Sequence, residues 1–327
     1  MSASTASAPT ANRVKPVHRK GRDSVSSWPL RDRLAIYACW GSGIFLCFVA
    51  ALLVGYMAFR GIQYISLEMI FTDPAVGASQ AESGGFLSPI LGTLLLTLIG
   101  TVIALPFAVA AAVWIVEYGR PAKLARAVEA GIEVVAGTPS IVLAIFGLLL
   151  FSNKIFELLS FAGDNGVVVG RSFFTAGAMM SLIAVPLIFT STREALLQIP
   201  AQVREASYAL GKTKWATIRK VLIPTCRPGI FTGTALGMGR IAGDTAIVVV
   251  LLGATLTMQP KGTDIPLLKT LRGSGSTLTS YVYNNSPSGE GNAPQKAYAA
   301  AFFLLLLVLA LNFGIDVFAR RSKKEIT

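Results

Sequence analysis

Arg240 and Asp244 are the residues whose types and spacing best suit chemistry inside a membrane. Both lie in an apolar stretch at residues 229–256, where charged side chains are costly and normally face a bundle interior or a water-filled cavity. Residues four apart share one face of a continuous helix. The Arg guanidinium offers five donors in a fork suited to oxyanions, and Thr245 adds a hydroxyl group. We predict that Arg240 attracts an anion and that Asp244 neutralises it; the alternative is a buried ion pair that only sets helix packing.

Few other side chains favour catalysis or metal binding. The single histidine, His18, lies in the N-terminal segment, which excludes a histidine-based metal site or catalytic triad. Cys39 and Cys47 lie in the first apolar stretch and Cys226 in a basic segment, without the spacing of a disulfide framework or a metal site. We predict no metal, no cofactor and no enzymatic activity in this chain.

The composition is that of an integral membrane protein. Hydrophobic residues make up 53% of the chain and charged residues 14%, whereas soluble domains carry about 25% charged residues. Stretches long enough to cross about 30 Å of hydrocarbon lie at residues 34–59, 87–116, 132–152, 173–191, 229–256 and 297–319. We therefore predict an all-α transmembrane domain over residues 34–319. Within its third span, Thr138-Pro139 predicts an interruption after which the helix restarts, with Thr138 as N-cap.

The basic residues orient these spans. Of the 29 Lys and Arg residues, 21 lie in segments 1–34, 117–131, 192–228 and 320–327. The opposite segments hold seven. Because cytoplasmic loops carry the excess of Lys and Arg, both termini are predicted to be cytoplasmic, as a disordered basic tail at 1–33 and a short tail at 320–327. The net charge of +12 does not indicate a nucleic-acid partner, because no nucleic-acid-binding motif accompanies it.

One cytoplasmic loop has the pattern of two short amphipathic helices. The first is predicted from about residue 201 to 210, with Gly211 as the turn or C-cap. The second starts near Thr213 and ends at Pro224, with an apolar face formed by Trp215, Ile218 and Leu222. The simplest interpretation is a pair of helices at the membrane interface.

The same loop contains a stretch, Ala206 to Thr213, that nearly matches a nucleotide-binding P-loop. A P-loop requires a preceding strand and a glycine-rich turn whose backbone N–H groups hold phosphates. Here the intervening residues, Ser-Tyr-Ala-Leu, are helical in character. We therefore predict that this chain does not bind ATP.

The spacing of this loop resembles a motif of the permeases of ABC importers, E-A-A, three residues, G, nine residues, I-x-L-P. The matching residues are Glu205-Ala206-Ser207, Gly211 and Val221-Leu222-Ile223-Pro224. The resemblance implies the six-helix permease fold of type I ABC importers, with cytoplasmic coupling helices that dock on an ATP-binding subunit. It implies an ATPase-coupling role for Glu205, Ala206, Gly211, Trp215, Ile218, Leu222 and Pro224.

A second resemblance concerns the cargo. Residues 239–246, Gly-Arg-Ile-Ala-Gly-Asp-Thr-Ala, are similar to the A-R-x-x-G-E-T-A signature of the A-type permease subunit of phosphate importers. Further matches include Gly84-Gly85, Glu117-Tyr118 and residues 137–142. The resemblance spans most of residues 84–320 and implies import of inorganic phosphate along a pathway that includes Arg240, Asp244, Thr245 and Thr190.

The sequence departs from this family at the inner end of span four. Family members often carry P-x-x-x-R-T-T-E there, whereas Thr190 occupies the Arg position and Arg193 the acidic position. Either the charge contact is rearranged, or Thr190 and Ser191 supply neutral hydrogen bonds.

The resemblance also implies partners in a bacterial inner membrane. These are a second homologous permease subunit, two copies of an ATP-binding subunit that bind ATP and Mg, and an extracytoplasmic phosphate-binding protein. We expect outer loops at 60–86 and 257–296, which include the Gly/Ser-rich stretch 272–276, to receive the binding protein.

Three other functions remain open from the sequence. The first is an ABC permease for another oxyanion, sulfate or molybdate. The second is a secondary transporter that uses Arg240 and Asp244 as a proton relay, although no inverted repeat is evident. The third, a membrane enzyme, lacks any nucleophile–base constellation.

Overall fold

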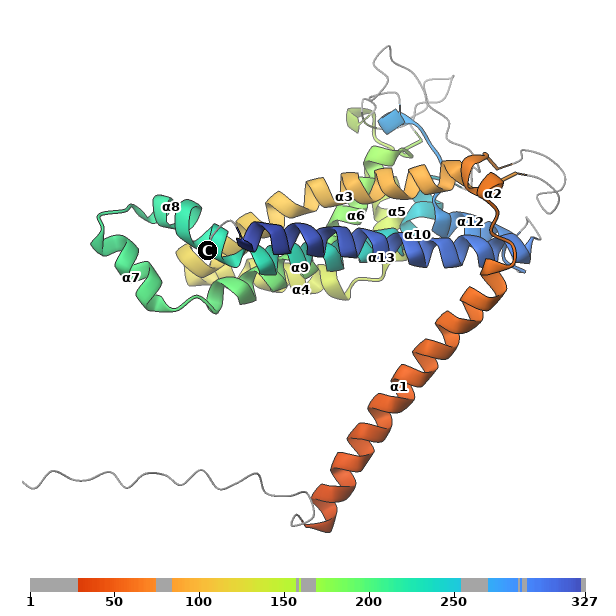
Figure 1. Ribbon diagram of the computed structural model, residues 1–327. Helices are drawn as coiled ribbons and strands as arrows, with labels where there is room; N and C mark the ends of the chain where they lie inside the picture. The colour runs from red at the N-terminus through yellow and green to blue at the C-terminus, as the bar shows by residue number, and fades with distance from the viewer. Residues whose placement is uncertain are drawn as a thin grey trace, which may run out of the picture. The chain divides into compact units, whose positions relative to one another are not determined.

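The computed structural model in Figure 1 describes residues 29–74, 84–156, 169–253, 270–287 and 293–324, together with Leu159 and Gly289. These residues are mainly helical and contain no strand beyond a single bridge between Pro74 and Gly84. The predicted tail up to residue 28, the end of the chain after 324 and parts of both predicted outer loops lie outside the described residues. The chain divides into two compact units, Met1–Gly55 and Tyr56–Thr327.

Four helices are long and apolar enough to cross a membrane. They correspond to predicted spans one, two, four and six: α1 (Leu30–Ile62), α3 (Leu87–Val113), α6 (Phe173–Leu197) and α13 (Pro294–Lys324). The π-helical turn η2 (Trp114–Tyr118) continues α3. Pro106 and Pro186 lie inside α3 and α6 without ending them. This agrees with the tolerance for proline in packed membrane helices.

The predicted third span is a bent pair of helices. α4 (Ala122–Gly137) and α5 (Ser140–Phe151) meet at 105°, so the predicted interruption is confirmed. The predicted start at residue 132 is wrong, because α4 already begins within the basic segment that was assigned to a loop. The predicted cap is also wrong: the Thr138 hydroxyl donates to the Val134 carbonyl (2.7 Å), and Pro139 precedes the first residue of α5.

The predicted fifth span is not one continuous helix. α9 (Ile223–Ala242) ends at Gly243, and α10 (Ala246–Leu251) follows after a short break. Glycine favours such ends, and the helix carries further Gly, Thr and Pro residues that lower its hydropathy. By length and composition, the described residues therefore contain four helices that could span a membrane, or five with the bent pair, and α9 is not among them.

Glycines bring the central helices of the Tyr56–Thr327 unit together. Along α9, Gly229, Gly233 and Gly237 face α6, and a Cβ atom at Gly233 would lie 2.9 Å from the Cα atom of Ile188. Small residues four apart are a common device for close helix packing in membranes. α3 packs against both α6 and α9, and α13 runs beside α9 (Figure 1). The core is apolar, with Leu96, Met180, Ile188 and Ile241 fully buried.

Residues 273–281, part of a predicted outer loop, enter this bundle instead. They lead into α12 (Leu278–Asn285), which packs against α13 and α3. Every residue from 273 to 281 is buried. The Leu278 N–H donates to the Thr93 hydroxyl of α3 (2.9 Å), and the N-cap of α12 is Thr277, in a capping box with Ser280. Residues 273–277 are non-helical, in agreement with the predicted loop at 272–276, but tertiary packing buries this Gly/Ser-rich stretch.

Candidate translocation and coupling sites

Arg240 and Asp244 do not form the predicted ion pair. The break at Gly243 removes them from a common helical face, and neither side chain makes an ion pair within the described residues. Asp244 is 4% exposed, and its Oδ1 accepts a hydrogen bond from the Ile247 N–H (3.0 Å) in the first turn of α10. The backbone carbonyl of Asp244 accepts from the Thr279 hydroxyl (3.1 Å). The prediction failed because it assumed one continuous helix; Asp244 instead fixes the start of the next one.

Arg240 is exposed and makes no hydrogen bond with the described residues. It ends a row of exposed residues along α9, which we call the α9 stripe: Thr225, Pro228, Thr232, Leu236 and Arg240. By contrast, the exposed side chains of α3 include Leu91, Leu98, Val102 and Phe107. The α3 face suits lipid, whereas an unpaired arginine in hydrocarbon is unfavourable. The α9 stripe therefore suits water or another polypeptide.

Thr190 is not brought together with Arg240. It lies on α6 and lines a hollow of about 200 Å³ with residues of α4, among them Glu129 and Glu133. Arg193, which occupies the family's acidic position, lies 3.1 Å from Glu129 Oε1. The Ser191 hydroxyl donates to the Gly229 carbonyl (2.8 Å). The charge contact at the end of span four is thus rearranged towards α4, as one of the two sequence-based alternatives proposed.

The first helix of the loop at residues 201–224 matches the prediction closely. α7 (Ala201–Ala209) ends at Gly211, which has a φ of +73°. The Gly211 N–H donates to the Tyr208 carbonyl (2.9 Å) and the Lys212 N–H to the Ser207 carbonyl (3.2 Å). This is the Schellman arrangement that favours glycine. The P-loop-like stretch therefore lies on a helix and its C-cap, and Glu205 and Ala206 are exposed on that helix.

The second helix differs from the prediction. α8 (Lys214–Thr217) starts at the predicted place, with Thr213 as its N-cap, but it continues through the π-helical turn η4 (Ile218–Leu222) into α9. Pro224 is the second residue of α9 and lies inside this continuous helical segment rather than at a helix end. The predicted apolar face is divided: Ile218 and Leu222 are buried in the core of this chain, whereas Trp215 is 61% exposed.

Side chains join the loop to the rest of the chain. The hydroxyls of Ser207 and Thr217, both buried, are 2.8 Å apart and connect α7 to α8. Arg204 forms an ion pair with Glu117 of η2 (2.9 Å). Sequence reasoning missed this pair because the two residues lie 87 positions apart; its only signal was that Glu117-Tyr118 belongs to the family resemblance.

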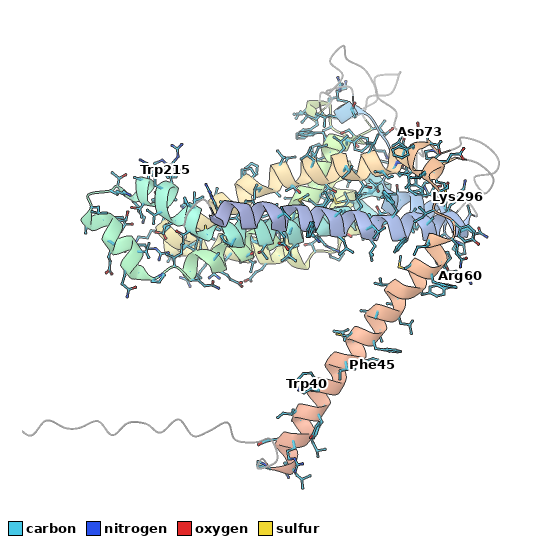
Figure 2. All side chains as sticks on the ribbon, in the orientation of Figure 1. Trp40, Phe45, Arg60, Asp73, Trp215 and Lys296 are labelled. Carbon is cyan, nitrogen blue, oxygen red and sulfur yellow. The ribbon has the colours of Figure 1, made fainter. Side chains whose placement is uncertain are left out.

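The two polar ends of the bundle lie far apart. Figure 2 places Trp215 at one end of α3, α9 and α13, and Asp73 and Lys296 at the opposite end. At that opposite end the Ser88 hydroxyl donates to Asp73 (2.6 Å) and Lys296 donates to the Gly84 carbonyl (3.1 Å). The loop at residues 201–224 and Asp73, which follows α2 (Leu67–Phe71), therefore lie at opposite ends of the Tyr56–Thr327 unit.

Solved structures share this fold. A chain of the MetNI methionine ABC transporter in an inward-facing conformation has a TM-score of 0.54 and 21% identity, over 73% of this chain and 94% of that chain. A chain of a bacterial alginate ABC transporter, in complex with an alginate-bound periplasmic protein, has a TM-score of 0.59 and 16% identity, over 89% and 96%. The predicted fold of type I ABC importer permeases is confirmed.

Curated relatives give the family. The phosphate transport system permease protein PstC of Pasteurella multocida is 32% identical over 75% of this chain and 78% of its own length. PstA 1 of Mycobacterium tuberculosis is 31% identical over 71% and 69%. The resemblance to phosphate permeases is confirmed, and it includes both PstA and PstC proteins. The family model of the binding-protein-dependent transport system inner membrane component matches residues 104–324. The chain therefore belongs to this family, and it is a multi-pass permease component of an ABC importer.

Proposed function

We propose that this chain forms half of the translocation pathway of an ATP-driven importer of inorganic phosphate. The observation that carries the proposal is Arg240, an exposed arginine without a partner among the described residues, at the end of α9. Relatives that are named phosphate permeases, PstA and PstC, support the same cargo. A guanidinium forms paired hydrogen bonds to phosphate, which gives both affinity and geometry.

The α9 stripe supports the assignment of a pathway. The hydroxyl groups of its two threonines already donate to backbone carbonyls of the same helical segment. Thr225 donates to the Val221 carbonyl (2.7 Å) and Thr232 to the Pro228 carbonyl (3.0 Å). They therefore offer weak polar contacts, and Arg240 is the single charged group of the stripe. Thr245, at the start of α10, lies next to this end of the stripe along the chain. Asp244 acts indirectly, because it fixes the start of α10, and Thr190 belongs to a separate hollow beside α4.

The loop at residues 201–224 docks on the ATPase. Its exposed apolar side chains, Tyr208, Leu210 and Trp215, form what we call the docking patch. Aromatic anchors of this type dominate many protein interfaces. Ile218 and Leu222 pack in the core and hold the loop against the bundle. A displacement of the docking patch is therefore transmitted directly to α9. In this proposal a dimer of ATP-binding subunits holds ATP and Mg, and this chain holds neither.

The remaining partners follow from the topology. A second, homologous permease subunit covers the α9 stripe and completes the pathway. An extracytoplasmic phosphate-binding protein docks at the end that carries Asp73 and Lys296, opposite Trp215 (Figure 2). Both termini are cytoplasmic, in a bacterial inner membrane.

Uptake measurements test the cargo. Vesicles that contain the complete importer are expected to accumulate radiolabelled phosphate in the presence of ATP and the binding protein, and vanadate should block this uptake. Unlabelled phosphate should compete, whereas sulfate and molybdate should not. Competition by sulfate or molybdate would favour another oxyanion. Uptake that resists vanadate but stops with an uncoupler would favour a proton-coupled secondary transporter.

Truncation of Trp215 tests the docking patch. Trp215→Ala should weaken binding of the ATP-binding subunit about 30-fold, because a tryptophan hot spot contributes about 2 kcal/mol or more. The measurement is a binding titration of the purified ATPase against the chain in nanodiscs. Phe71→Ala is the matched control: Phe71 is 70% exposed on α2, at the end of the unit opposite Trp215. Equal binding by both variants would contradict docking through this patch.

A further inference from the structure

Arg204 connects three parts of the chain at the base of the docking loop. Its Nε donates to Glu117 Oε1 (2.9 Å), its Nη1 to the Ile199 carbonyl (2.7 Å) and its Nη2 to the Leu196 carbonyl (3.0 Å). Leu196 and Ile199 lie at the end of α6, Glu117 lies at the end of α3 in η2, and Arg204 itself lies in α7. One side chain therefore ties the first docking helix to two spans.

The second docking helix contacts the same place. The Lys214 ammonium at the start of α8 donates to the Glu117 carbonyl and lies 4.5 Å from the centre of the Tyr118 ring. The π-helical turn η2, closed by Gly119 with a φ of +45°, presents both the carboxylate and the carbonyl of Glu117 to the loop. Such turns often mark functional positions in helices. We call Glu117, Arg204 and Lys214 the junction.

Burial distinguishes this contact from an ordinary surface ion pair. The side chains of Glu117 and Arg204 are 6% and 20% exposed, whereas those of the Glu129–Arg193 ion pair are 29% and 39% exposed. Exposed ion pairs have little effect on stability. A buried pair resists separation, because the charge left behind is neither solvated nor paired. The docking helices are therefore expected to move together with the ends of α3 and α6.

We propose that Glu117 and Arg204 are positioning residues that carry the displacement of the docking loop to α3 and α6. The proposal rests on the proposed function, since it needs an ATPase at the docking patch. When the ATPase moves α7 and α8, Arg204 pulls on the carboxylate of Glu117 and on two carbonyls of α6. Rigid elements with few, strong contacts transmit such movements well. Without the junction, ATP hydrolysis continues but α3 and α6 follow it less.

Neutral variants of the complete importer test this proposal. Glu117→Gln removes the negative charge but keeps an oxygen that accepts a hydrogen bond from Arg204. Arg204→Gln removes the guanidinium group and its three hydrogen bonds. Both should assemble with the ATPase and hydrolyse ATP at near-normal rates, while phosphate moved per ATP falls about tenfold, within the usual range of coupling between sites. Lys123→Gln is the control, because Lys123 is exposed on α4, outside the docking loop, and makes no hydrogen bond or ion pair with the described residues.

A second measurement does not depend on the cargo. In a chain whose Cys39, Cys47 and Cys226 are replaced by Ser, a cysteine introduced by Thr190→Cys, at an exposed position of α6, reports nucleotide-driven movement of that helix through its rate of maleimide labelling. ATP should change this rate in the control and leave it unchanged in Glu117→Gln. An importer that shows this ATP response but takes up no phosphate would contradict phosphate as cargo and leave the junction supported.

Two results would overturn the junction. Unchanged phosphate per ATP together with a normal ATP-dependent labelling response in Glu117→Gln would show that the pair transmits nothing. If both neutral variants fail to bind the ATPase while Lys123→Gln still binds it, the pair only supports the structure of the docking loop and is not a positioning pair.

Discussion

Arg240→Ala is expected to lower phosphate uptake by about 10- to 100-fold, because a hydrogen bond to a charged group contributes about 1.5–3 kcal/mol. The side chain is exposed on the α9 stripe and unpaired among the described residues, so its loss leaves no buried charge behind. The variant should therefore still fold and bind the ATPase. The measurement is initial uptake of radiolabelled phosphate, normalised to assembled complex.

Charge and geometry can be separated at this position. Arg240→Lys keeps the charge but loses the bidentate fork, so it should retain part of the activity. Lys123→Ala removes an exposed basic residue of α4, outside both the α9 stripe and the docking loop, and should leave uptake unchanged. Arg240 also lies in the last turn of α9, where a cation stabilises a helix end. Full uptake by an assembled Arg240→Ala importer would contradict a role in phosphate transport. Arg240 would then only stabilise the end of α9.

Local signals predicted the cytoplasmic loop well. The end of α7 at Gly211 and the start of α8 at Thr213 depend on capping contacts between residues only a few positions apart. Glycine in the left-handed region and threonine as N-cap are preferences of the residue itself. The long apolar helices were predicted for a similar reason, since hydropathy over about twenty residues is also a local property.

The errors arose where distant segments decide the outcome. Trp215 was assigned to one face with Ile218 and Leu222, which is correct for a helix, but only the latter two have neighbouring helices to cover them. Trp215 lies at the end of the bundle, where that face is exposed (Figure 2). Asp244 was assigned to Arg240 because the apolar stretch gave no sign that the helix breaks at Gly243.

Two further features had no local signal. Glu117 and Arg204 lie in segments that read as a span end and a basic loop, and only the fold brings them together. Residues 273–281 combine Gly, Ser and Thr, a composition typical of exposed loops. Their burial depends on α3, whose Thr93 accepts from the Leu278 N–H and whose Gly92 leaves room for the backbone.

Gly92 gives the strongest test of this packing. A Cβ atom at Gly92 would overlap the backbone carbonyl oxygen of Ser276, which a side-chain rotation cannot relieve. Gly92→Ala should therefore destabilise the chain by about 1–3 kcal/mol, as overpacking of a core does, and Gly92→Val by more. The measurement is the apparent melting temperature of the purified chain in detergent, followed by loss of the monodisperse peak on size-exclusion chromatography.

The sign of the change in stability distinguishes overpacking at Gly92 from an effect of helix propensity. Replacing a helical glycine with alanine without a clash stabilises a helix by about 0.5–1 kcal/mol. Gly314→Ala provides that case, since α13 leaves nothing within 4 Å of a Cβ atom there. We expect the melting temperature to rise or stay constant for Gly314→Ala and to fall for Gly92→Ala. A rise in both would mean that residues 273–281 do not pack on α3, and that the Gly/Ser-rich stretch is the outer loop its composition predicts.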